Sequence, residues 1–539
     1  MNQNRFTLNR YPLGQAIVLC LTCFGLFFAF YKPVISAFED LQVEYLLGGG
    51  FGLAPDLHLF YLNGWHPLLF SPVYLLYRWI PEANWYGIFL LLIQFLSHVA
   101  LLYQLLKKLG PGYGSLVYLI FFLLFGASFL QKLEISTTSS LLALSACIGL
   151  ITKFQSQKQE ENRTAILCGI ILVIALLLRL HTAVLILILC LFTAILVLKG
   201  KFLKRFLLVV VIALAASLGA FQLQKIYYQQ EKDYSSLEKK SALYFNYINR
   251  KNFQFTPVDS FQKIASSFIS TSYWIDSSLV IKENIDPMIK SYSLSALSDL
   301  SENKAGLYWA FRNNRIYLLL IALLIALSIT TGKRRLIYNS VLAILTGLLA
   351  YFTILVFFKM REHIILSVAA TVFFSVLLII SKERTRLTST KRIIFLSLLF
   401  CLGGWKLAQL KRSQSVLNQQ IAFTKSFISS VAASPKTLFL NFGNEGWQAL
   451  GVFDSPKNFP IKNVITRELF MTGKCFPIFT SFGIGDLKNQ LSDNERVVLM
   501  GSSQPDWKGY FRWKQKREVE MIASENLLNI PCFQLKSIH

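Results

Sequence analysis

Residues 164–198 read TAILCGIILVIALLLRLHTAVLILILCLFTAILVL, and this stretch decides the class of fold. It contains two apolar runs, 164–180 and 182–198, which meet at the very tight turn Arg179-Leu180-His181. A helix needs about 20 apolar residues to cross the hydrocarbon core of a bilayer. We therefore interpret the stretch as two membrane-spanning helices joined on one side of the membrane.

The same pattern continues in both directions along the chain of 539 residues. Hydrophobic residues make up 54% of it, charged residues only 15%, and the mean hydropathy is +0.48, which is too apolar for a soluble globular protein. Further apolar stretches of spanning or nearly spanning length lie at 13–31, 84–106, 112–130, 135–152, 204–222, 316–332, 337–358, 363–381 and 393–410. The sequence predicts a polytopic α-helical membrane protein with about 11 transmembrane helices.

Basic residues fix the expected orientation, because cytoplasmic loops carry an excess of Lys and Arg. Every second connection is basic: Arg5 and Arg10, Lys107 and Lys108, Lys153 to Arg163, Lys199 to Arg205, Lys333 to Arg335, and Lys382 to Arg392. We expect a multi-pass protein of the plasma (inner) membrane with a cytoplasmic N-terminus. The formal net charge of +25 follows from these loops, so no nucleic-acid partner is expected.

Three large polar segments then face away from the cytoplasm. Two of them, 32–83 and 223–315, belong to an expected transmembrane domain over 1–410, and the third is a C-terminal domain over 411–539. That domain has strand-like runs at 437–442, 496–500 and 532–535, with helix-like stretches at 445–452 and 484–491 between them. We expect a small extracytoplasmic α/β domain there, in which Cys475 and Cys532 could form a disulfide.

Residues 62–80 are apolar, but an additional span there would reverse the orientation of the N-terminus. His66, Pro67, Pro72 and Arg78 also disfavour a span. We interpret the stretch as a helix lying in the membrane interface. Its aromatic residues at headgroup depth would be Trp65, Tyr74, Tyr77 and Trp79.

Adjacent carboxylates, Glu39 and Asp40, follow the first span, and Glu44 comes one helical turn after Asp40. Carboxyl groups near apolar surface have raised pKa values, which suits a general base, and their oxygens could also bind a divalent cation. A solvated loop after a helix is the alternative interpretation. A metal site from Asp56, His58, His66 and Asp40 is conceivable, but the spacing matches no metal motif.

Basic side chains also gather on the outward side, where positive charge is normally avoided. His181 accompanies Arg179 in one outward turn, while Lys359, Arg361 and His363 share a later one. Such a set suits an anionic headgroup such as a lipid phosphate. The alternative is that these side chains only anchor helix ends at the interface.

This layout resembles the C-type glycosyltransferase superfamily (GT-C), whose polytopic enzymes use polyprenyl-phosphate sugar donors. The resemblance is carried by Glu39-Asp40 in the first outward loop, an interfacial helix there, Arg179, and Lys359 to His363. It implies inverting transfer at the extracytoplasmic face, with Asp40 as general base and Glu39 assisting or holding a cation. Arg361, His363, Arg179 and Lys359 would hold the donor phosphate, and the lipid tail would lie between spanning helices.

The resemblance leaves the acceptor open as a glycan, a lipid or a protein. Glu44, Asp56, His58, His66 and His181 are candidates for shaping the acceptor site. No cofactor is certain, and a divalent cation on Asp40 and Glu39 is the candidate. Other interpretations are a flippase or transporter of lipid-linked sugars, a polysaccharide polymerase or ligase, and a non-catalytic scaffold. Spanning segments nearly free of charge favour chemistry at the boundary over passage through the membrane.

Overall fold

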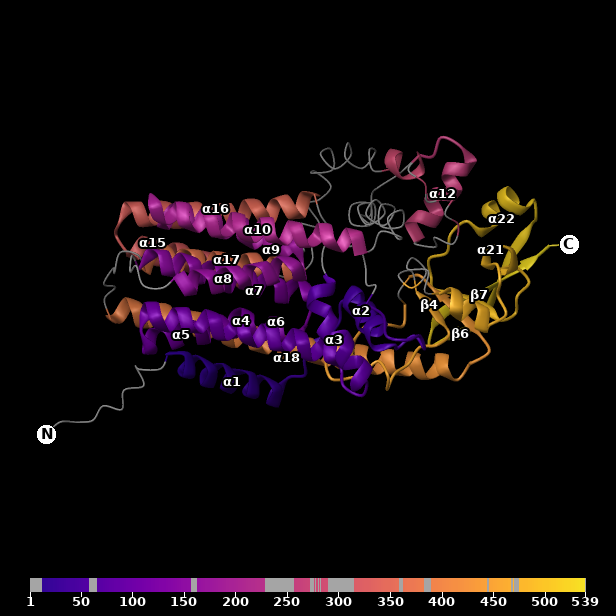
Figure 1. Cartoon of the computed structure of the whole chain (residues 1–539), viewed down its shortest axis with the longest axis horizontal. Coiled ribbons are helices and arrows are strands. Elements are labelled where there is room, and N and C mark those ends of the chain that lie inside the picture. The colour runs from indigo at the N-terminus through magenta and orange to yellow at the C-terminus, as the bar shows by residue number, and fades with distance from the viewer. Residues whose placement is uncertain are drawn as a thin grey trace.

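The computed structural model of the chain is mostly helical and describes most of its residues. These are residues 12–57, 65–156, 162–227, 256–271, 276, 278–279, 281, 283–288, 315–357, 362–381, 389–443, 445–466, 469 and 475–538. Figure 1 shows the spanning helices side by side in one bundle, with the C-terminal strands beyond one end of it. The site lies between these two parts.

All eleven predicted spans are helices in the structure. Nine helical stretches in the described part of the chain are long and apolar enough to cross a membrane, and two shorter apolar helices occupy the other predicted positions. The longer ones are α1 (Pro12–Phe30), α4 (Trp85–Leu109), the run of α5 (Pro111–Phe121), η2 (Phe122–Gly126) and α6 (Ala127–Gln131), α7 (Ile135–Gln155), α9 (Leu180–Val197), α10 (Lys201–Tyr227), α16 (Arg334–Phe357), α17 (Glu362–Ser381) and α18 (Ser389–Ala432). The shorter ones are α8 (Asn162–Leu178) and α15 (Arg315–Thr330). The predicted fold class is confirmed.

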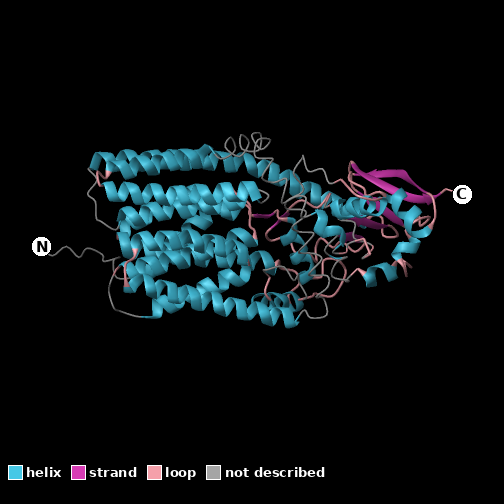
Figure 2. Cartoon of the chain, turned by 90° about the horizontal axis from the view of Figure 1, so that it is seen from above, coloured by secondary structure: helices cyan, strands magenta, loops and turns pink. Residues whose placement is uncertain are grey.

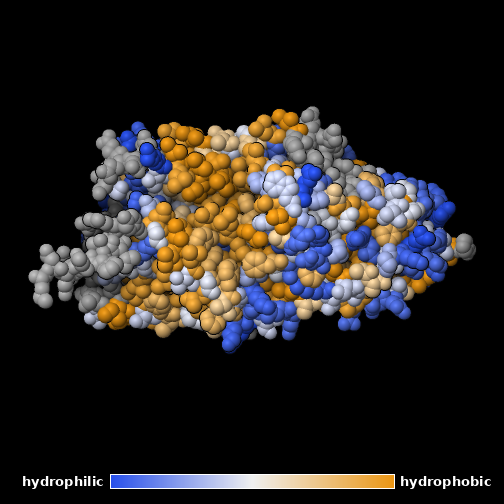
Figure 3. Space-filling view, turned by 60° about the horizontal axis from the view of Figure 1, so that its bottom comes forward, coloured by the Kyte–Doolittle hydropathy of each residue, from blue (hydrophilic) through white to orange (hydrophobic). Residues whose placement is uncertain are grey.

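Helix α7 lies at the centre of the bundle and packs against α4, α8 and α9. Its outward half, meaning here the half toward the C-terminal sheet, is rich in small hydroxyl residues, which let neighbouring helices approach closely. Ser139 donates a hydrogen bond from Oγ to the carbonyl oxygens of Ala175 and Arg179, at 2.9 and 3.1 Å. The turn between α8 and α9 is thereby fixed to the core of the bundle. Figure 3 shows hydrophobic residues over the bundle and hydrophilic ones over the C-terminal part.

Two short helices cover the outward end of the bundle, α2 (Phe38–Gly48) and α3 (Pro67–Trp79). Helix α3 has 13 residues, so at about 1.5 Å per residue it is too short to cross a bilayer. Leu68 and Trp79 are exposed on it. Trp65 and Tyr77 are buried inside the protein, and their headgroup depth stays a prediction.

The C-terminal part contains a five-stranded sheet in the order β4-β2-β5-β7-β6. Strands β2 (Leu438–Asn441), β4 (Val464–Thr466) and β5 (Val497–Met500) are parallel, while β7 (Ile530–Ser537) and β6 (Val519–Leu527) form an antiparallel hairpin at the edge. The strands expected near 438, 497 and 532 are confirmed. Short helices α20 (Phe476–Ser481), α21 (Leu487–Gln490) and α22 (Trp507–Gln515) accompany them.

The prediction of a helix over 445–452 is wrong. Gly446 adopts a positive φ of 86°, which turns the chain, and β3 (Leu450–Gly451) then pairs with β1 (Val34–Ile35) of the first outward segment. Trp447 packs its indole ring against Phe38 and Tyr45 of α2. The C-terminal domain is therefore attached directly to the segment that carries the predicted carboxylates. Figure 2 shows strands beyond the end of the helical bundle, on the side of the C-terminus.

Helix α12 (Ser260–Thr271), from the central polar segment, packs against α22 of the C-terminal domain. The ring centroid of Phe268 lies 5.0 Å from that of Trp507. Asp276 follows α12 and is buried, where it accepts a hydrogen bond from Tyr510 Oη at 3.0 Å. The Nζ atoms of Lys488 and Lys514 each lie 3.4 Å from its carboxylate. Two segments far apart in the sequence thus form one outer layer.

Candidate active site

The carboxylate pair lies in the first turn of α2. Glu39 and Asp40 occupy the N-terminal end of the helix, where the dipole favours negative charge. The helix ends at Gly49, whose φ of 70° suits glycine, and whose N–H bonds to the carbonyl of Tyr45. At Gly50 a Cβ would lie 2.4 Å from the Tyr45 ring, so the three consecutive glycines at 48–50 allow a tight turn here.

Asp40 is buried beneath α4 and the start of α7. Its carboxylate accepts a hydrogen bond from the Tyr86 hydroxyl and lies 3.3 Å from the backbone N–H of Ile135. Burial raises the pKa of Asp40 to about 7, against the opposing effect of the Tyr86 hydrogen bond. The negative charges of Glu134 and Glu39 raise the pKa further, and the positive charge of Arg179 lowers it. Such a carboxyl group exchanges a proton readily near neutral pH.

Glu39 pairs with Arg179, as their predicted positions on the outward side allow. Arg179 Nη2 lies 2.9 Å from Glu39 Oε2, and both side chains are largely shielded from solvent. Arg179 occupies the N-cap position of α9, in the tight turn recognised in the sequence. Its Nη1 atom is buried and has no hydrogen-bond partner among the described residues. A buried guanidinium nitrogen without a partner is suited to an anionic ligand.

Two aromatic residues that the sequence analysis did not assign to the site connect these charged groups. The guanidinium carbon of Arg179 lies 4.7 Å from the centroid of the Trp65 ring. Trp65 Nε1 donates to the Tyr86 hydroxyl oxygen at 3.3 Å, and Tyr86 donates to Asp40. The contacts therefore close a ring from Glu39 through Arg179, Trp65 and Tyr86 to Asp40.

Glu44 lies one turn after Asp40 and is fully buried. Its Oε1 accepts from Asn84 Nδ2 at 2.9 Å, while Oε2 has no partner within the described part of the chain. Burial raises the pKa of Glu44 well above its ordinary value, and the charges of Asp454 and Asp40 add to the effect. The contact of Glu44 with Asn84, the N-cap residue of α4, fixes the N-terminus of that helix.

The predicted histidines have different places. His66 caps α3, accepting from the Leu68 N–H at Nδ1 (3.3 Å) and donating from Nε2 to the Ala220 carbonyl at 2.8 Å. Burial lowers the pKa of His66, and its two hydrogen bonds hold α3 against α10. His181 is exposed in the first turn of α9.

The other predicted residues fall into three groups. Asp56 is half-buried after α2, and its N–H bonds to the carbonyl of Leu46 at 3.0 Å. His58, Lys359 and Arg361 and the side chain of His363 lie outside the described residues. Cys475 and Cys532 are buried thiols rather than a disulfide pair.

The carboxylates of Glu39 and Asp40 are the residues at which the sequence allows a divalent cation. Among the residues that the structure describes, no group of three or more His, Cys, Asp or Glu side chains is arranged to hold a metal ion. The Glu39 carboxylate instead uses one oxygen to bind Arg179.

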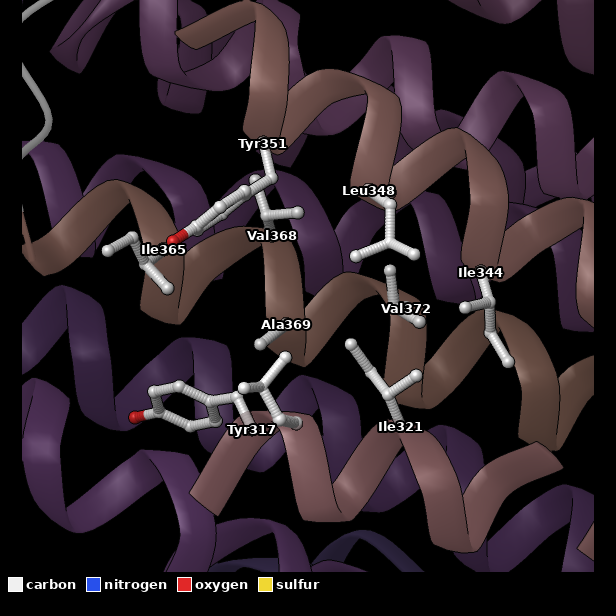
Figure 4. Close-up of a pocket in the computed structure, with 11 residues that line it drawn as sticks. Tyr317, Ile321, Ile344, Leu348, Tyr351, Ile365, Val368, Ala369 and Val372 are labelled. Atoms are coloured by element: carbon white, nitrogen blue, oxygen red, sulfur yellow. The ribbon is translucent and has the colours of Figure 1, made fainter. Parts of the chain in front are cut away.

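An apolar groove that is open to the surface lies between α15, α16 and α17 (Figure 4). Its walls include Ile321, Ile344, Leu348, Val368 and Val372. Tyr317 and Tyr351 carry the hydroxyl groups seen in Figure 4, and they lie near the outward ends of α15 and α16. The ammonium group of Lys406, on α18, is 5.4 Å from the ring centroid of Tyr317.

Comparison with known proteins gave two solved structures. No family model matches the chain, and no curated protein does. The crystal structure of ArnT from Cupriavidus metallidurans bound to undecaprenyl phosphate matches with a TM-score of 0.42 and 12% identity, over 96% of this chain and 98% of that chain. The apo structure of the same protein gives a TM-score of 0.39 and 12% identity, over 96% and 97%. We base the functional proposal on the geometry of the site.

Proposed function

We propose that this protein is a membrane glycosyltransferase that transfers a sugar from a polyprenyl-phosphate donor to an acceptor hydroxyl at the extracytoplasmic face, with inversion. One observation carries the proposal. A buried carboxyl group with a pKa of about 7, on Asp40, adjoins the Glu39–Arg179 pair, in which Arg179 keeps an unpartnered buried Nη1. A proton acceptor and an anion-binding donor therefore meet at one end of the helical bundle.

Asp40 would act as the general base. When the acceptor oxygen forms its bond to the anomeric carbon, its hydroxyl proton passes to the Asp40 carboxylate. The bond from the anomeric carbon to the phosphate oxygen breaks at the opposite side, and polyprenyl phosphate leaves with the electron pair. A positioned base contributes about 10²–10⁴-fold to the rate of such a step.

Arg179 would bind the phosphate and stabilise the charge that develops on it. A fixed donor in a site with little water is worth far more than the same donor in solution. Glu39 holds the guanidinium by its second nitrogen, Nη2, at 2.9 Å. Lys359 and Arg361, in the connection between α16 and α17, and His363, in the first turn of α17, are proposed as further phosphate ligands. A divalent cation on Glu39 and Asp40 stays part of the proposal as an alternative source of positive charge.

The groove between α15, α16 and α17 would take the polyprenyl chain. That chain is a long hydrocarbon, and burying it against apolar side chains is favourable by about 25 cal/mol per Å². The hydroxyl-bearing end of the groove, at Tyr317 and Tyr351, lies toward the connection that carries Lys359 and Arg361. The acceptor, a glycan, a lipid or a protein, would approach from the C-terminal domain.

Labelled polyprenyl-phosphate sugars, offered to the purified protein in liposomes, test the proposal. We expect a new glycosidic product with inverted configuration, and Asp40→Asn should abolish its formation while the melting temperature stays within a few degrees. Near-normal turnover by Asp40→Asn would remove this residue from the mechanism. Movement of unchanged donor across the bilayer, without product, would instead identify a flippase.

A further inference from the structure

Trp65 and Tyr86 link the two chemical halves of the site, although neither carries a charge. We propose that they are positioning residues, which hold the Asp40 carboxylate and the Arg179 guanidinium in fixed register for one donor and one acceptor. This inference rests on the proposed function of the site. The observation behind it is the closed ring of contacts from Glu39 through Arg179, Trp65 and Tyr86 to Asp40.

Tyr86 has its hydrogen-bonding capacity used by neighbours within the protein. Its single proton goes to Asp40 Oδ1, and its oxygen accepts the indole N–H of Trp65 at 3.3 Å. The residue is fully buried in the first turn of α4. A phenol so occupied has no proton to give to a substrate, so its effect on the reaction passes through Asp40.

Trp65 serves the other half of the site with the face of its ring. The guanidinium carbon of Arg179 lies over this ring, 4.7 Å from its centroid, within the range of a cation–π contact. The contact holds the guanidinium against the ring while Nη2 meets Glu39 and Nη1 has no partner among the described residues. A side chain without an aromatic face would remove this contact.

The backbone of Trp65 supplies independent support. Its φ is +48°, in the left-handed region that bulky residues rarely adopt, and its side chain is 1% exposed. A strained conformation persists only where the surroundings hold it, and such positions concentrate at functional sites. Here the surroundings are the two contacts, to Arg179 and to Tyr86, that the inference uses.

Several titratable groups face Asp40 and contribute to its titration. They are Tyr86 from α4, Glu134 from the N-cap of α7, Arg179 from the turn before α9, and Glu39 and Glu44 from α2 itself. Removing only the Tyr86 hydroxyl leaves all the charges in place. The pH dependence of transfer therefore isolates the effect of that one hydrogen bond.

The experiment measures kcat and the donor KM of the full-length protein in liposomes as a function of pH. Tyr86→Phe should keep the donor KM within about twofold and move the rising limb of kcat up by about one pH unit, because the charged carboxylate loses a donor. At a pH below that limb the rate should then fall about tenfold and recover at alkaline pH. Trp65→Phe keeps a ring beneath Arg179 and should shift the limb less.

Trp65→Leu removes the flat face and should raise the donor KM by about five- to tenfold. Tyr118→Phe, a matched buried tyrosine of the bundle that contacts Cys20 and His98, should leave both limb and KM unchanged. The inference would be overturned if Asp40→Asn is inactive but Tyr86→Phe leaves the rising limb of kcat against pH unshifted. It would equally be overturned if Tyr86→Phe lowers the rate by the same factor at every pH. Full activity of Asp40→Asn would refute the proposed function itself.

Discussion

Helix α4 carries a buried polar cluster at its outward end and another in its middle, and the two differ in kind. At the outward end Tyr86 contacts an acid and, through Trp65, an arginine. In the middle His98 Nδ1 lies 3.1 Å from the Tyr118 hydroxyl, which accepts from the Cys20 thiol at 3.2 Å. The comparison teaches that the acid and the arginine lie at the end of the bundle beside the C-terminal domain, while the cluster within the bundle is built from imidazole, phenol and thiol groups.

The largest effect on transfer is expected for Arg179, the cation of the outward cluster. Arg179→Ala removes the proposed phosphate ligand and leaves Glu39 without its ion pair, so kcat/KM should fall by about 10²–10³-fold. Steady-state assays with the labelled donor measure it. Arg78→Ala, at the exposed C-terminal end of α3, is the control and should behave as wild type. An active Arg179→Ala variant would show that the phosphate binds elsewhere.

The second largest effect is expected in the pH dependence of transfer, which should follow the titration of Asp40 in the outward cluster. The pKa of Asp40 is raised to about 7, so its basic form is lost as pH falls below that value. We expect the rate to drop about tenfold per unit below the midpoint and to be level above it. A profile that is flat from acid to neutral pH would contradict the role of Asp40.

A smaller effect, on stability, is expected at Asp276 in the outer layer formed by α12 and α22. There a buried carboxylate lies beside two lysines. Burial disfavours the charged form of Asp276, but hydrogen bonds from Ser278 and the charge of Lys488 outweigh it and lower the pKa to about 2. Because the folded-state pKa is below the unfolded one, this stabilisation is present above about pH 4 and is lost as pH falls through about 2.

Asp276→Asn should therefore destabilise the C-terminal domain at neutral pH. The loss should be about 1 kcal/mol, since the partly exposed lysines screen the pair. Thermal unfolding at neutral and at acid pH measures it, and the difference from wild type should shrink in acid. A difference that is the same at both pH values would mean that the charge of Asp276 is not responsible.

The smallest effect belongs to the middle of the bundle. Tyr118→Phe removes the hydroxyl between Cys20 and His98, and hydrogen bonds inside membrane proteins contribute about 0.6 kcal/mol on average. We expect a slightly lower melting temperature and an unchanged rate of transfer. A strong loss of transfer would extend the catalytic cluster into the membrane and end the contrast between the two clusters.

The helices of the bundle could be predicted because an apolar run of spanning length has one stable conformation in lipid. The end of the last helix could not. Residues 411–432 are polar, yet α18 continues through them to Ala432 as a single helix of 44 residues. Its stability there comes from packing with β3 and its neighbours, which no local pattern encodes.

Within the site, the charged residues could be predicted but their connection could not. Glu39, Asp40 and Arg179 stood out as ionic groups at the ends of apolar runs. Trp65 and Tyr86 look like ordinary interfacial aromatics, since Trp and Tyr are enriched at that depth in membrane proteins. Only the tertiary structure turns them inward, with Trp65 reversing its backbone at a φ of +48°.

The pairing of β1 with β3 has a consequence for biosynthesis. Val34 is made early and is held by Gly451, near the end of the chain, while the loop after β3 contacts α4 around Gly87. Chains grow from the N-terminus at about 5–20 residues per second, so the bundle can insert long before its partner strand leaves the ribosome. Until then β1 and α2 lack their contacts with β3 and Trp447, so the surroundings of the carboxylates are completed only when the C-terminal domain has been made.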